Sequence, residues 1–197
     1  MCIRDRIYPG HEVANGYFAM ADTELERISG ITKQTLRWSR EDINRRHWTS
    51  ANYLFDDAVR LFAGKIRNRA VTVSIPPDDI PVYGAVSQLR QVLTNLLSNA
   101  LDAVPVGGNI RFESAASETH ATLKVIDEGI GMSSELQRKI FEPYFTTKGD
   151  LGNGLGLYIS REIIESHGGT LSVASEPGGG STFVAILPVP KVDALGA

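Results

Sequence analysis

Two asparagines one helical turn apart are the first candidates for chemistry in this sequence. Asn95 and Asn99 lie within residues 86–104, where apolar residues recur at the spacing of a helix that packs against a core. Its apolar side comprises Val86, Leu89, Leu93, Leu96, Leu97, Ala100 and Val104. The opposite side carries Gln91, Asn95, Asn99 and Asp102, with neither lysine nor glutamate. Short oxygen-bearing side chains suit a hard cation such as Mg²⁺, although a solvated helix face remains the alternative.

A carboxylate at the end of a predicted strand is the second candidate. Residues 121–127 alternate between apolar and polar side chains and end at Asp127, and Gly129 and Gly131 follow. Glycines allow the backbone to bend closely around a ligand. A buried carboxylate at this point can accept a hydrogen bond from an exocyclic amine such as that of adenine. The alternative is an ordinary tight turn after a strand.

Three glycines before a predicted helix form a candidate anion site. Gly152, Gly154 and Gly156 lead into a helix expected over residues 154–167, whose first N–H groups and dipole attract anions. Lys148 would add a point charge. A dinucleotide-binding loop is excluded because no strand directly precedes the glycines, and a Walker A loop is excluded because no Gly-Lys-Ser/Thr occurs.

An aromatic segment precedes those glycines. Residues 140–148 contain Phe141, Tyr144 and Phe145, within a stretch expected to be irregular from 133 to 153. Aromatic side chains in an irregular segment indicate that it docks on something. We therefore interpret the segment as a lid over a bound nucleotide. The alternative is an ordinary loop held in place by Phe141 and Phe145.

The elements that must position these residues form an α+β pattern. Strands are expected at 47–52, 70–75, 82–83, 109–115, 121–127, 170–175 and 181–187, and helices at 53–69, 86–104 and 154–167. Strands grouped around three helices predict a two-layer sandwich over residues 46–190.

The flanking residues are expected to lie outside this domain. Residues 17–45 predict one long amphipathic helix of about 40 Å, whose apolar stripe needs either a partner helix or its own domain to cover it. Residues 1–16 show no pattern and indicate a truncated or non-native start, and residues 191–197 are expected to be disordered.

Composition limits the classes of function. The 197 residues carry a formal net charge of −3, so charge gives no case for binding nucleic acid or an anionic membrane. Cys2 is the sole cysteine, which excludes a disulfide framework and a thiolate metal site. No apolar run approaches the ~20 residues of a membrane span, and the N-terminus lacks the hydrophobic core of a signal peptide. We therefore expect a cytoplasmic chain.

Four stretches with chemistry-bearing residues occur in one order along the chain. They are residues 95–103 (Asn-Leu-Leu-Ser-Asn-Ala-Leu-Asp-Ala), 127–132 (Asp-Glu-Gly-Ile-Gly-Met), 140–148 (Ile-Phe-Glu-Pro-Tyr-Phe-Thr-Thr-Lys) and 152–157 (Gly-Asn-Gly-Leu-Gly-Leu). His-Gly-Gly-Thr at 167–170 and Gly-Gly-Gly-Ser-Thr-Phe at 178–183 follow. Together they resemble the N, G1, F and G2 boxes of the catalytic ATP-binding domain of two-component sensor histidine kinases, within the gyrase, chaperone and kinase ATPase superfamily. The resemblance covers residues 46–190.

The resemblance implies a Bergerat-type fold, in which a mixed sheet packs against three helices and ATP lies between the glycines and the lid. It implies that Asn99 holds Mg²⁺ with Asn95 beside the phosphates, and that these two are the catalytic residues. Asp127 would take the adenine amine, and Thr182 would lie near the adenine end. The implied ATP-binding set is Asn95, Asn99, Asp102, Asp127, Gly129, Gly131, Lys148, Gly152, Gly154, Leu155, Gly156 and Thr182.

The N-terminal region departs from a complete kinase. The helix over 17–45 resembles the second helix of the family's dimerisation hairpin, whose first helix should carry a His-Glu pair followed by proline. His11 is followed by glutamate but lies between Gly10 and Gly16, with no proline after it. We therefore expect that His11 is not the phosphoacceptor and that this chain lacks the acceptor helix. The full-length protein is expected to form a homodimer through the hairpin, and its missing N-terminal part leaves room for a membrane anchor.

The sequence therefore predicts an ATP-dependent protein-histidine kinase that binds Mg-ATP. It would transfer the γ-phosphoryl group to a histidine outside this chain. Its protein partner would be the receiver domain of a response regulator. Two alternatives stay open. An ATP-gated clamp or ATPase of the same superfamily would carry glutamate where Asn95 stands, and steady ATP hydrolysis would favour it. A binding module that has lost catalysis would be favoured by the absence of Mg-ATP binding.

Overall fold

The structure, a computed structural model, describes residues 45–147 and 154–190. These residues belong to a compact unit that begins at Asn44. The predictions for residues 1–16, for 17–44 of the long helix and for the tail at 191–197 lie outside the described residues. The same holds for the candidate site residues His11, Lys148 and Gly152.

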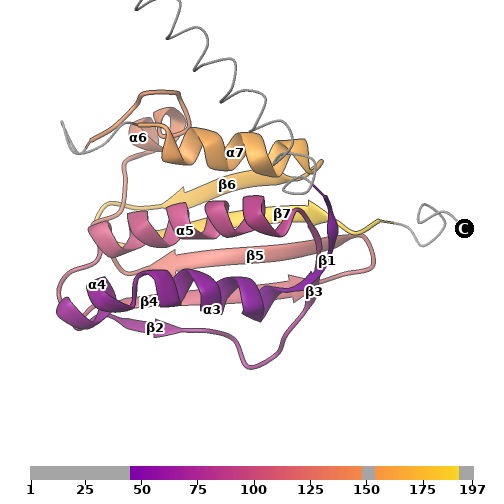
Figure 1. The fold of residues 1–197 in the computed structure, drawn as a ribbon. Helices are drawn as coiled ribbons and strands as arrows, with labels where there is room; N and C mark the ends of the chain where they lie inside the picture. The colour runs from indigo at the N-terminus through magenta and orange to yellow at the C-terminus, as the bar shows by residue number, and fades with distance from the viewer. Residues whose placement is uncertain (1–44, 148–153, 191–197) are drawn as a thin grey trace, which may run out of the picture. The chain divides into compact units, whose positions relative to one another are not determined.

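A mixed five-stranded sheet forms one layer of the domain (Figure 1). Its strands, in spatial order, are β2 (Thr72–Ser74), β4 (Asn109–Ala116), β5 (His120–Asp127), β7 (Ser181–Pro188) and β6 (Thr170–Ser175). β2 runs parallel to β4, and every other neighbouring pair is antiparallel. A separate two-stranded antiparallel sheet joins β1 (His47–Ser50) to β3 (Pro81–Gly84). The predicted α+β fold with a mixed sheet is confirmed.

The longer helices cover one face of the sheet (Figure 1). They are α3 (Ala51–Leu61), α5 (Val86–Ala103) and α7 (Gly156–Ser166), and α5 packs against both of the others. α3 begins after Ser50, whose hydroxyl accepts a hydrogen bond of 3.0 Å from the backbone N–H of Tyr53, the usual N-cap contact. Among the helices in residues 45–147 and 154–190, none is long and apolar enough to cross a bilayer.

Two short helices differ from the sequence expectation. The helix predicted over 53–69 is interrupted at Phe62, whose φ of −101° and ψ of 11° end α3 and begin α4 (Ala63–Asn68). A further helix, α6 (Ser134–Lys139), lies within the stretch predicted to be irregular, and Ser133 caps it by accepting a hydrogen bond from Leu136 N–H. A cap or a single non-helical residue acts within one turn, so hydrophobic periodicity over a longer window does not register it.

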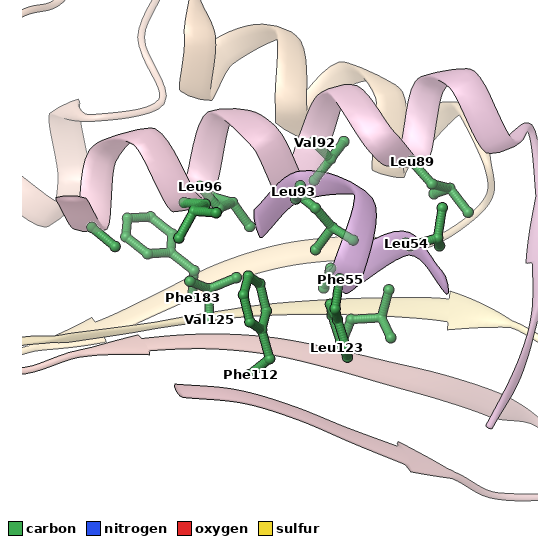
Figure 2. Packing of buried hydrophobic residues seen from close by; sticks show 14 of the residues in the cluster. Leu54, Phe55, Leu89, Val92, Leu93, Leu96, Phe112, Leu123, Val125 and Phe183 are labelled. Atoms are coloured by element: carbon green, nitrogen blue, oxygen red, sulfur yellow. The ribbon is translucent and has the colours of Figure 1, made fainter. Parts of the chain in front are cut away.

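Side chains from α5 and α3 pack onto the central strands, on the helix-covered face of the sheet (Figure 2). Leu89 and Leu93 of α5 are each 1% exposed, and they belong to one buried cluster with Phe112 of β4 and Phe183 of β7. The ring of Phe55 on α3 stacks on Phe112 with 4.6 Å between the ring centroids. Each fully buried leucine contributes about 2 kcal/mol to folding. This cluster holds α5, and with it the polar side of α5, in a fixed orientation.

A buried histidine connects the end of α7 to the start of α5. His167 Nδ1 lies 2.7 Å from the carbonyl oxygen of Ile163, which is a pure acceptor, so Nδ1 carries the proton. His167 Nε2 therefore accepts the hydrogen bond of 3.0 Å that the backbone N–H of Ala85 donates. Ala85 offers no side-chain cap of its own to α5. The neutral imidazole thus fixes the distance between two helices that carry candidate site residues.

This histidine makes folding stability depend on pH. Burial lowers the pKa of His167, and this outweighs the hydrogen bond to Ile163, which raises it. Its pKa in the folded chain is therefore below the unfolded value of about 6.5, and the unfolded chain binds more protons between the two values. We expect the free energy of unfolding, measured in urea, to fall as pH is lowered below 6.5.

A His167→Gln variant should lose this part of the pH dependence, because glutamine does not titrate. The matched control is His120→Gln, since His120 is an exposed histidine at the start of β5. The control should keep the wild-type slope of unfolding free energy against pH. Equal slopes in the two variants would contradict the assignment.

Candidate nucleotide-binding site

Asp127 ends β5 as a buried carboxylate. Its side chain is on the helix-covered face of the sheet, like that of Val125 two residues earlier, and Asp127 is 4% exposed. Its Oδ1 atom accepts a hydrogen bond of 2.9 Å from the backbone N–H of Gly129. Burial raises the pKa of Asp127, although backbone hydrogen bonds from Gly129 and Ser181 lower it in part. A carboxylate so poorly solvated favours a further donor, and an exocyclic amine supplies one.

The loop after Asp127 is held between α5 and the β6–β7 turn. The backbone N–H of Ile130 donates to the carbonyl of Ala103 at 3.3 Å, and Gly178 N–H donates to the carbonyl of Ile130 at 2.7 Å. Gly131 has φ +64°, and a Cβ atom there would lie 1.8 Å from the carbonyl oxygen of Glu176. Glycine is therefore required at 131 both for its backbone conformation and for the close approach of the turn.

Gly131→Ala is expected to destabilise the domain by about 2 kcal/mol or more, because φ strain alone costs 1–2 kcal/mol and the backbone contact must also shift. Gly107→Ala is the matched control, since Gly107 has φ +78° with nothing within 4 Å of an added Cβ. Urea unfolding of both variants separates strain from the clash with Glu176. Equal losses of stability in the two variants would show that the β6–β7 turn moves away from the added Cβ atom without a further cost.

Asn95 connects the polar side of α5 to the start of α7. Its Nδ2 atom donates to the carbonyl oxygen of Gly156 at 3.1 Å and to the hydroxyl of Ser160 at 3.2 Å. Asn99, one turn later on α5, is half-buried. Asp102 lies at the far end of the same side, where its carboxylate forms an ion pair with Lys65 of α4. Asn95 therefore faces Gly156 at the start of α7, whereas Asp102 faces α4.

The aromatic segment lies against Gly154, just before α7. Gly154 has φ +62°, and a Cβ atom there would lie 2.3 Å from the carbonyl carbon of Tyr144. Phe141 is 8% exposed, and the guanidinium carbon of Arg161 lies 5.4 Å from its ring centroid. Phe145 packs against the core cluster. The described part of the segment is therefore pinned by Phe141 and Phe145, and the lid interpretation stays a prediction.

The start of α7 presents backbone groups rather than charge. Leu155 is the N-cap residue of α7, without a side-chain capping bond, and Gly156 is the first residue of the helix. The first N–H groups of a helix lack intrahelical partners and suit an anion. α7 has no acidic residue in its first turn. The described residues at this end therefore do not oppose a phosphate group.

Thr182 does not lie beside Asp127. The antiparallel register pairs Asp127 with Ser181 and Ile126 with Thr182. Since Phe183 is in the core, Thr182 is on the face of β7 that is directed away from the helices, and Ser181 shares the face of Asp127. Alternation back from Phe183 could have identified Ser181 from the sequence. Ser160, the second residue that sequence reasoning missed, is recognisable only from its contact with Asn95.

The polar side of α5 fits a Mg²⁺ ion held partly by a substrate. Within residues 45–147 and 154–190, no three histidine, cysteine or acidic side chains gather as a metal-binding cluster. Mg²⁺ usually keeps several waters and binds through one or two protein oxygens together with substrate phosphates. The amide oxygens of Asn95 and Asn99, one turn apart on α5, are compatible with this arrangement and with no all-protein cage.

Comparison with known proteins identifies relatives of this domain. Residues 84–191 match the family described as histidine kinase-, DNA gyrase B-, and HSP90-like ATPase. The signal transduction histidine-protein kinase AtoS of Escherichia coli is 35% identical over 176 residues, which cover 88% of this chain and 29% of AtoS. Sporulation kinase E of Bacillus subtilis is 34% identical over 176 residues, which cover 88% of this chain and 24% of that kinase. The chain thus spans about a quarter of the length of these curated relatives.

Solved structures show the same fold. The nucleotide-free catalytic domain of histidine kinase ThkA is 33% identical, with a TM-score of 0.63 over 72% of this chain and 97% of that domain. ThkA in complex with the response regulator protein TrrA matches with 30% identity and a TM-score of 0.63, over 92% of this chain and 53% of that one.

Proposed function

This chain belongs to the histidine kinase-, DNA gyrase B- and HSP90-like ATPase family and carries the catalytic domain of a sensor histidine kinase; we propose that it binds Mg-ATP and transfers the γ-phosphoryl group to a histidine of an acceptor helix outside residues 45–190. In this transfer the bond between the γ-phosphorus and the bridging oxygen breaks, a P–N bond forms at an imidazole nitrogen, and ADP leaves.

One observation supports the proposal most directly: α5 contacts both ends of the candidate site. Near its middle, Asn95 bonds to Gly156 at the start of α7, and at its end Ala103 bonds to the loop that follows Asp127. Eight residues of helix separate these contacts, which is about 12 Å. That length is comparable with the separation of the base and the terminal phosphate in an extended nucleoside triphosphate.

Each part of the site then has a role. Asp127 accepts a hydrogen bond from the adenine amine, and the N–H groups at the start of α7 bind phosphate oxygens. Asn99 holds Mg²⁺, which neutralises charge on the phosphates when it is bound. Asn95 is an amide and takes no proton, so it does not activate water as the glutamate of an ATPase clamp would. We therefore expect transfer to a histidine rather than steady hydrolysis.

The partners follow from the relatives. The complex of ThkA with TrrA is a kinase bound to a response regulator protein. By analogy we propose that the phosphoryl group passes on to the receiver domain of a response regulator. We also propose that the full-length protein is a homodimer through its acceptor hairpin, which brings the acceptor histidine to this domain.

The proposal is tested by calorimetric titration of the chain with Mg-ATP, followed by mixing with a separately produced acceptor hairpin of the full-length protein. We expect binding and then acid-labile, base-stable phosphate on the hairpin. Binding with steady ADP release but no transfer would indicate the ATPase clamp instead. Absence of Mg-ATP binding would indicate a module that has lost catalysis.

A further inference from the structure

We propose that Ser160 is a positioning residue that holds the Asn95 amide in the orientation set by the Gly156 carbonyl, with its oxygen free to serve a Mg²⁺ ion on the triphosphate. Ser160 is fully buried, with 0% exposure, on the side of α7 that packs against α5. Its hydroxyl donates to the carbonyl of Gly156 at 2.8 Å and accepts from Asn95 Nδ2 at 3.2 Å. The inference rests on the proposed binding of Mg-ATP.

The orientation of Asn95 follows from the chemistry of its neighbours. The carbonyl oxygen of Gly156 is a pure acceptor, so the Asn95 atom that lies 3.1 Å from it must be the donor Nδ2. A flipped amide would place two acceptor oxygens against each other. Oδ1 is on the other arm of the amide and is directed away from this carbonyl. It is therefore the oxygen that would serve a Mg²⁺ ion bound to the triphosphate, because phosphate oxygens are themselves acceptors.

The Ser160 hydroxyl stabilises this orientation with a second contact. A serine that bonds to the carbonyl one turn earlier in its own helix gains little for the helix itself, and such bonds slightly destabilise or bend it. Here the Ser160 hydroxyl oxygen also accepts a hydrogen bond from Asn95 Nδ2. This second bond explains why a hydroxyl is buried next to apolar residues such as Ile159 and Ile163. Alanine at 160 would leave Asn95 with one fixed bond and freedom to rotate about it.

Ser160→Ala is therefore expected to weaken Mg-ATP binding about fivefold, the equivalent of one hydrogen bond. Adenosine binding should not change, because adenosine engages only the Asp127 end. In an Asn95→Ala background, Ser160→Ala should have no further effect on Mg-ATP affinity, since it acts through Asn95. Ser166→Ala is the matched control: Ser166 is on the same helix and donates to the Ile163 carbonyl at 2.7 Å, at the opposite end from Asn95.

The orientation of the Asn95 amide can also be measured without nucleotide. In the free protein, the side-chain NH₂ signals of Asn95 in a ¹⁵N–¹H spectrum, assigned by their loss in Asn95→Asp, should be well separated and protected from exchange. They should converge and exchange faster in Ser160→Ala but not in Ser166→Ala. Unchanged signals, or additive effects of Ser160→Ala and Asn95→Ala on Mg-ATP affinity, would overturn the inference while leaving the proposed function intact. A wild-type chain that failed to bind Mg-ATP would overturn both.

Discussion

Replacement of Asn99 by alanine is expected to abolish phosphoryl transfer to a supplied acceptor hairpin and to remove the Mg²⁺-dependent part of ATP binding. Asn99 is a half-buried amide one turn after Asn95 on the polar side of α5. Removing one preorganised group that stabilises developing charge commonly costs about 100- to 1000-fold in rate. Alanine is the strongest helix former, so α5 and the apolar side that it packs into the core should remain intact.

The measurement compares radiolabel transfer from ATP and calorimetric ATP binding, each with Mg²⁺ and with a chelator. Asn68→Ala is the matched control, because Asn68 is an exposed asparagine at the end of α4, outside the site. Asn99→Ala should show the same weak ATP binding with and without Mg²⁺, and Asn68→Ala should behave as wild type. Full transfer by Asn99→Ala would remove Asn99 from the proposed mechanism.

Periodicity predicted the core of this domain well, for a physical reason. The spacing of Leu89, Leu93 and Leu97 on α5 is set by burial against a sheet, and all three are buried. Periodicity assigned only one buried side to α5, and therefore missed Val92 and Leu101. Both are buried because α5 is packed between α3 and α7 as well as on the sheet. That second packing depends on tertiary neighbours, which a single helix pattern does not contain.

The candidate site was predictable where a motif lies within one element. Asp127 at the end of a strand and the glycines at the start of a helix were recognised from residue type and local order. Contacts between distant elements were not, as the bond from Asn95 to Ser160 shows. The position of Ser181 opposite Asp127 required the register of β5 and β7. The pairing of Asp102 with Lys65 likewise depends on how α4 lies against the end of α5.

Asp127→Asn is expected to weaken binding of both ATP and adenosine by about 10- to 100-fold, the equivalent of a hydrogen bond to a charged group. Asparagine keeps one acceptor oxygen, which can still take the Gly129 N–H. Its second group, however, is an NH₂ donor, which opposes the adenine amine. Asp56→Asn is the matched control, since Asp56 is exposed on α3. Calorimetric titration with adenosine isolates the effect on the base from any effect on the phosphates.

The same variant should not lose stability, which separates binding from folding. Burial raises the pKa of Asp127 in the folded chain above its unfolded value, so the folded chain binds more protons between the two values. The ionised carboxylate therefore opposes folding at neutral pH, and its contribution becomes more favourable as pH falls through the folded pKa. A neutral amide avoids this desolvation, so the free energy of unfolding of Asp127→Asn at pH 7 should equal or exceed that of wild type.

A lower adenosine affinity together with a higher free energy of unfolding would mean that burial of Asp127 serves ligand binding and lowers the stability of the ligand-free domain. A fall in both would contradict this reading. It would mean that the carboxylate holds the Gly129 loop through its charge, and that weak binding follows from a disordered loop. Unchanged adenosine affinity with normal stability would instead place the base elsewhere, because the one oxygen of an amide at 127 is occupied by the Gly129 N–H.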